Sequence, residues 1–119
     1  MSAQTAVVMW HNPRCSKSRG TLELLRERGI EPRIVDYQKN PPSPAELEHA
    51  LKLLGLGPRE LMRKGESVYA ERNLDNPALT RKQLIDAMAA YPILIERPIV
   101  FANDKAAIGR PPEAVLAIL

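Results

Sequence analysis

Apolar positions in the first forty residues follow a strand, helix, strand order. Residues 6–10 form an apolar run that ends in Trp10, which is typical of a strand buried on both faces. In residues 16–28 the leucines lie along one stripe of a helix, and Gly29 follows as a stop signal. Residues 33–37 predict a second strand. This order predicts a right-handed crossover that joins two parallel strands.

A helical pattern replaces the strand pattern over residues 41–91. Prolines end the preceding structure, and Ser43 with Glu46 three residues later predicts a capped helix start. Thr80 and Gln83 repeat that spacing further along. The apolar positions at helical spacing are Leu47, Leu51, Leu54, Leu84, Ile85 and Met88, and residues 58–63 continue the pattern. We expect a helical insertion packed beside the sheet, not an independent domain.

Strand signals return after residue 92. Residues 99–102 and 106–108 flank Asn103-Asp104, which predicts an antiparallel hairpin. Residues 111–119 begin with two prolines and a glutamate and predict a final helix. The order predicts an α/β fold, a thioredoxin-like mixed sheet with a helical insertion. Residues 1–119 would be one domain, with its core at about 5–38 and 92–119 and the insertion at about 41–91.

Composition narrows the class of protein. The 119 residues suit one domain, 26% are charged, and no apolar run is long enough to span a bilayer. A single cysteine cannot form an internal disulfide, and residues 1–5 do not begin a secretory signal, so we expect a cytoplasmic protein. The net charge is only +3, and the sequence has no block of consecutive basic residues. Both features argue against nucleic-acid binding.

Cys15 is the candidate nucleophile. It lies in residues 11–19, His-Asn-Pro-Arg-Cys-Ser-Lys-Ser-Arg, which we expect to be a basic loop between the first strand and the first helix. A helix N-terminus and nearby cations lower a cysteine pKa from about 8.5 to between roughly 3.5 and 7.5. The loop follows a parallel strand, where open sheets place their sites. The alternative is a buried, unreactive cysteine.

Other polar residues could assist this thiol. His11 lies four residues before it and could bond the sulfur, steady the loop, or have no chemical role. Arg63, Arg97 and Arg110 carry the planar group that suits tetrahedral oxyanions, although each alone would be an ordinary surface arginine. The two histidines and one cysteine lack metal-ligand spacing, so no metal is expected.

Four ordered segments resemble the glutaredoxin-linked arsenate reductase family, especially its short members. They are residues 11–19, Leu-Met-Arg-Lys at 61–64, Glu-Arg-Pro-Ile-Val at 96–100 and Gly-Arg-Pro-Pro-Glu at 109–113. The resemblance implies a thioredoxin-like fold in which Cys15 attacks arsenate while Arg63, Arg97 and Arg110 bind the oxyanion. It also implies that His11 helps to keep the thiolate. Ser18, Arg19 and Pro98 would support the site, with a cis peptide bond at Pro98.

The lone thiol agrees with an external reductant. Reduction of arsenate needs two electrons, and one cysteine cannot regenerate itself, so glutathione would be the co-substrate and glutaredoxin would resolve the mixed disulfide. No bound cofactor is expected, and we expect a monomer. Two alternatives stay open: a glutathione-dependent thiol oxidoreductase that binds no arsenate, and a redox regulator that binds RNA polymerase. Ser18 replaces the second cysteine that such a regulator uses.

Overall fold

The structure is a computed structural model that describes residues 6–119. These residues form two compact units. The first runs to Tyr37 and resumes from Arg97 to Leu119, and the second is Gln38–Glu96. The second unit contains the helical segment expected at 41–91. The assignment of the whole chain to one domain stays a prediction.

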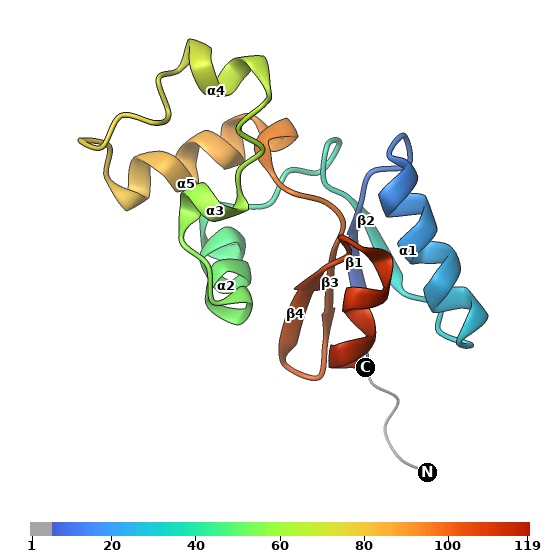
Figure 1. Cartoon of the computed structure of the whole chain (residues 1–119). Helices are drawn as coiled ribbons and strands as arrows, with labels where there is room; N and C mark the ends of the chain where they lie inside the picture. The colour runs from blue at the N-terminus through green and yellow to red at the C-terminus, as the bar shows by residue number, and fades with distance from the viewer. Residues whose placement is uncertain (1–5) are drawn as a thin grey trace. The chain divides into compact units, whose positions relative to one another are not determined.

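The first unit is built on a four-stranded mixed sheet (Figure 1). Its strands are β1 (Val8–His11), β2 (Arg33–Asp36), β3 (Ile99–Ala102) and β4 (Lys105–Ile108), in the order β2-β1-β3-β4. β1 is parallel to β2 and antiparallel to β3, and β3 is antiparallel to β4. The predicted parallel crossover and the C-terminal hairpin are therefore confirmed.

The helix α1 (Ser16–Glu27) and the 3-10 helix η2 (Pro112–Ile118) pack together against one face of this sheet. Their shared core is buried and apolar: Val7, Met9, Leu22, Leu25, Val100, Ala102, Val115 and Ile118. Gly29 ends α1 with a φ of +77°, as the stop signal predicts. The final helix expected at 111–119 is present, and it is of the 3-10 type. Prolines at its start lack amide donors, and Ala114 bonds back three residues to Pro111.

A tight turn joins β3 to β4. Asn103 and Asp104 both adopt positive φ angles, 53° and 60°, as a two-residue hairpin turn requires. The side-chain amide of Asn103 also donates to the Ile118 carbonyl at 2.8 Å. The turn that the sequence predicted therefore also holds the end of η2.

The second unit is helical. It contains α2 (Pro44–Leu54), α3 (Pro58–Leu61), α4 (Ser67–Glu71), α5 (Arg81–Ala90) and the 3-10 helix η1 (Pro92–Leu94). Both predicted capping boxes are present, at the starts of α2 and α5. The helix expected over 58–63 ends at Leu61, because Met62 instead forms a β-bridge with Ile95. The sequence patterns predicted neither α4 nor η1.

Strand boundaries differ from the prediction in a way that matters for the site. β1 starts at Val8 and continues to His11, whose backbone pairs with Asp36 of β2. His11 therefore belongs to a strand, and placing it in the basic loop was wrong. Among the described residues, no helix is long and apolar enough to cross a membrane.

Candidate active site

Cys15 occupies the N-cap of α1, with extended backbone angles (φ −97°, ψ 126°). Its amide donates to the Asn12 carbonyl at 3.0 Å, which closes the turn between β1 and the helix. The thiol is partly exposed and forms no disulfide. Because the amides of the first helical turn have no partner within the helix, they are available to an anion at this position.

The surroundings of Cys15 favour its thiolate. Partial burial acts to raise the pKa of the thiol, but the backbone amides of Ser18 and Lys17 hydrogen-bond to the sulfur and act in the opposite direction. The charge and side-chain hydrogen bonding of Arg97 lower the pKa further. The net effect is a Cys15 pKa below its ordinary value. A lowered pKa increases the fraction of nucleophilic thiolate at neutral pH.

Arg97 brings unsatisfied donors to this thiol. The residue precedes a cis peptide bond to Pro98, the position where the resemblance implied one. Its Nε and Nη1 atoms are buried, and neither has a hydrogen-bond partner among residues 6–119. Buried donors are nearly always paired in proteins, so two unpaired guanidinium nitrogens beside a thiolate are suited to an anionic ligand.

His11 contacts Ser18. Its Nδ1 atom lies 2.8 Å from the Ser18 hydroxyl oxygen, and both side chains are buried. The pKa of His11 is lowered, chiefly by burial and further by the positive charges of Arg26 and Arg19, while Asp36 opposes the shift. Among the roles considered from the sequence, this geometry fits a neutral imidazole that steadies the turn.

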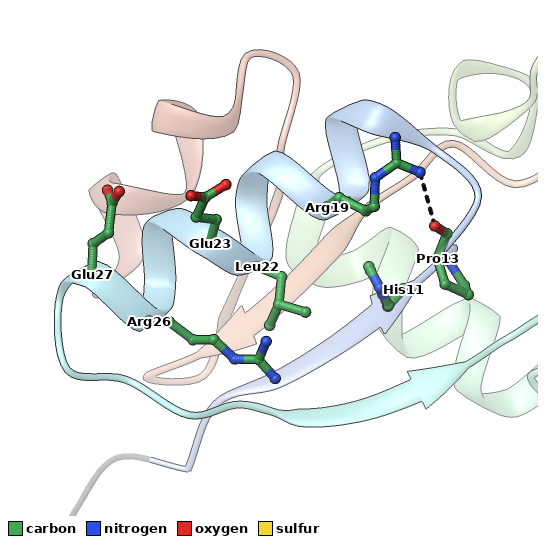
Figure 2. Close-up of a pocket in the computed structure, with 7 residues that line it drawn as sticks. All are labelled: His11, Pro13, Arg19, Leu22, Glu23, Arg26 and Glu27. Carbon is green, nitrogen blue, oxygen red and sulfur yellow. Dashed lines mark hydrogen bonds between the residues drawn. The ribbon is translucent and has the colours of Figure 1, made fainter.

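Three side chains hold the turn itself. The Ser18 hydroxyl accepts the Asn12 amide at 3.0 Å, and the Asn12 side chain accepts the Arg14 amide at 3.0 Å. Arg19 donates to the Pro13 carbonyl, also at 3.0 Å (Figure 2). Ser18 and Arg19 therefore both contact the turn that carries Cys15.

The other two predicted arginines occupy different surroundings. Arg110 lies in the loop before η2 and, like Arg97, precedes a cis proline, which the sequence did not predict. Arg63 belongs to the helical unit, where its guanidinium pairs with Glu66 and approaches Glu96 at 4.0 Å. The convergence of Arg63 on Cys15 therefore stays a prediction.

A groove of about 600 Å³ lies along α1 in the first unit (Figure 2). It is lined by His11, Pro13, Arg19, Leu22, Glu23, Arg26 and Glu27. Cys15 does not line the groove. The groove instead lies beside His11, Pro13 and Arg19, which belong to the turn that carries Cys15 or contact it. No spacing in the sequence predicted this hollow. Within residues 6–119, no group of three or more His, Cys, Asp or Glu side chains is arranged to hold a metal ion.

This fold and site define a thioredoxin-like protein with one cysteine at the start of its first helix. Comparison with known proteins identifies the family: residues 10–118 match the ArsC family, and the chain belongs to it. The fold class expected from the sequence is thus confirmed, as is the family resemblance.

Individual relatives cover nearly the whole chain. The uncharacterized protein YfgD of Escherichia coli K12 is 54% identical over 95% of this chain and 96% of its own length. An arsenate reductase of Neisseria meningitidis is 49% identical over 95% of this chain and 97% of its own. The structure of an arsenate reductase from Vibrio cholerae superposes with a TM-score of 0.96, at 48% identity, over 98% of this chain and 100% of that one.

Proposed function

We propose that this protein reduces arsenate to arsenite, with Cys15 as the nucleophile. The observation that carries the proposal is the Arg97 guanidinium, whose charge acts on the Cys15 thiol while two of its buried nitrogens have no partner among the described residues. Relatives at about half identity over almost the full chain bear the name arsenate reductase, which supports the choice of substrate.

In the first step the Cys15 thiolate attacks arsenic and forms an S–As bond, and one arsenate oxygen leaves as water after taking up protons. Attack of one anion on another is repulsive unless cations and dipoles surround both. Arg97 and the amides of Ser18 and Lys17 supply this positive environment. Arg110 and Arg63 are proposed as further ligands of the oxyanion.

Glutathione completes the two-electron reduction. Its thiol displaces a second arsenate oxygen, which leaves as water. The two sulfurs on arsenic then join in a disulfide. Of the two electron pairs in the S–As bonds, one becomes the S–S bond and the other stays on arsenic as a lone pair, so As(V) becomes As(III). Addition of one water gives arsenite. The sum is one arsenate and two thiols converted to one arsenite, one mixed disulfide and one water.

Regeneration needs a second external thiol, because Cys15 is the only cysteine of the chain. We propose that glutaredoxin attacks the mixed disulfide, takes the glutathionyl group and returns Cys15 to its thiol by exchange. This supply of thiols is typical of the cytoplasm, where we expect the protein to act. In this scheme His11 stays neutral and keeps the turn in place through Ser18.

A coupled assay tests the proposal. Purified protein is mixed with arsenate, glutathione, glutaredoxin and glutathione reductase, and NADPH oxidation is followed. We expect arsenate-dependent turnover in the wild type and none in Cys15→Ser, which keeps a side chain of similar size but loses the nucleophile. Full activity of Cys15→Ser would remove Cys15 from the mechanism.

A low thiol pKa also favours one competing function, glutathione-dependent thiol exchange without arsenate. The two functions differ in their need for an oxyanion. Arsenate, phosphate and sulfate are added separately while the alkylation of Cys15 is followed. A reductase site predicts that arsenate protects the thiol, whereas an exchange enzyme predicts no protection by any oxyanion and turnover on a glutathionylated peptide.

A further inference from the structure

Gly109 occupies a position that has no room for a side chain. It is buried, and its amide donates to the Pro98 carbonyl at 2.9 Å. A Cβ atom added there would lie 2.9 Å from Pro98 Cγ and still closer to the Thr21 hydroxyl oxygen. Its φ angle is not positive, so the close approach of neighbouring atoms, and not the backbone conformation, requires glycine here.

Thr21 forms the other wall of this contact. Its side chain is fully buried, and its hydroxyl donates to the Lys17 carbonyl of α1 at 2.9 Å. The backbone amide of Lys17 hydrogen-bonds to the Cys15 sulfur. Thr21 therefore connects Gly109 to the helical turn that holds the thiol.

The contact joins three segments that carry the candidate reactive groups. Thr21 belongs to α1, which starts after Cys15. Pro98 follows Arg97 through a cis peptide bond, and Gly109 directly precedes Arg110. All three segments lie in the first unit. The three contacting residues are called the Gly109 junction below: Thr21, Pro98 and Gly109.

We propose that Gly109 and Thr21 are positioning residues, and that the close packing of the Gly109 junction places Arg97 and Arg110 relative to the Cys15 sulfur. For the two arginines as oxyanion ligands the inference rests on the proposed function. For the placement of Arg97 beside the thiol it does not. A displaced guanidinium would affect both the reactivity of the thiol and the capture of the anion, since catalysis depends on alignment.

The test compares Gly109→Ala with Gly20→Ala. Gly20 is a matched control, because a Cβ there would lie at an ordinary 3.6 Å from Pro112 Cγ. Two properties are measured: the rate of Cys15 alkylation by iodoacetamide against pH, and the KM and kcat for arsenate in the coupled assay. Loss of one nearby cation raises a thiol pKa, so we expect Gly109→Ala to slow alkylation at neutral pH by roughly threefold to tenfold. We expect kcat/KM to fall by about tenfold or more, chiefly through KM. Gly20→Ala should behave as wild type.

A second pair of variants separates steric displacement from general damage. Thr21→Ala removes the hydroxyl oxygen that the new Cβ would meet, so Thr21→Ala/Gly109→Ala should recover part of both losses. Thr21→Val puts a methyl group where the oxygen was, so Thr21→Val/Gly109→Ala should recover neither. If Gly109→Ala does not fold, Thr21→Ile is measured in its place, because its longer branch presses on the same contact from α1.

The outcomes are distinguishable from those of the proposed function. If Gly109→Ala slows the alkylation of Cys15 and the added Thr21→Ala change restores its rate, the role of the Gly109 junction is supported. This holds even if the wild type shows no arsenate turnover, because that absence would contradict the reductase proposal alone. The inference is overturned if folded Gly109→Ala, or folded Thr21→Ile, has the alkylation profile of the wild type. It is also overturned if Thr21→Ala and Thr21→Val rescue Gly109→Ala equally.

Discussion

The imidazole of His11 and the hydroxyl of Ser18 are joined by a buried hydrogen bond of 2.8 Å. The same hydroxyl accepts the amide of Asn12, and the amide of Ser18 hydrogen-bonds to the Cys15 sulfur. One serine therefore connects the end of β1, the turn and the first turn of α1. Cys15 is joined to this small network through the Ser18 amide.

Ser18→Ala should destabilise the protein. The change leaves His11 Nδ1 and the Asn12 amide without the partner they have in the wild type, and an unsatisfied buried polar group costs about 1–3 kcal/mol. Urea unfolding followed by circular dichroism measures the loss. Ser16→Ala, at an exposed position of the same helix, is the control. Equal stability of the two variants would contradict the structural role of the Ser18 hydroxyl.

Acid should weaken the fold through His11. Its folded-state pKa is below the ordinary value of 6.5, so the unfolded chain binds a proton first as the pH falls. The contribution of His11 to the free energy of unfolding is then fully present above about pH 6.5. It is lost as the pH falls from there towards the lower pKa of the folded state. The free energy of unfolding should therefore drop between about pH 7 and 5 in the wild type. His11→Asn, which cannot titrate, should show a smaller drop. If the free energy of unfolding falls equally with pH in both proteins, His11 is not the cause of the loss.

Arg97→Ala should impair the thiol and the capture of arsenate together. Removal of the cation should raise the pKa of Cys15, because a nearby positive charge favours the thiolate. The KM for arsenate should rise. Arg97→Lys keeps the charge but loses the planar fork, so it should restore the thiol pKa more than the KM. Arg33→Ala, on the exposed edge strand β2, is the control. An unchanged KM in Arg97→Ala would exclude the proposed contact.

Ser43→Ala should destabilise the helical unit without altering the thiol. Ser43 accepts the Glu46 amide at 3.1 Å, and loss of such a cap costs about 1 kcal/mol. Thermal unfolding measures the change, and Cys15 alkylation should match the wild type. Ser67→Ala is the comparison, because α4 begins beside Glu66 with no side-chain cap. A stability loss as large in Ser67→Ala would show that the cap is not the cause.

Much of the fold was predictable because its signals are local. Ser43 with Glu46, Thr80 with Gln83 and the pair Asn103-Asp104 each specify a cap or a turn through contacts within four residues. The structure contains all three. The position of Cys15 at the start of a helix was also predictable from the local sequence pattern.

Features that depend on distant contacts were not predictable. Met62 leaves the helix pattern because it pairs with Ile95, thirty-three residues later, and no local signal marks that bridge. His11 pairs with Asp36 and bonds Ser18, so it extends β1 where the sequence indicated a loop. The approach of Arg63 to Glu96 likewise joins residues thirty-three positions apart, and no local signal marks it.

A chain with one sulfhydryl group per molecule has a practical consequence. Any disulfide that Cys15 forms must join it to another molecule, so the increase in mass identifies what was captured. Intact-mass spectrometry of protein trapped during turnover would therefore distinguish a glutathionyl group, a glutaredoxin and a second copy of this chain in a single spectrum.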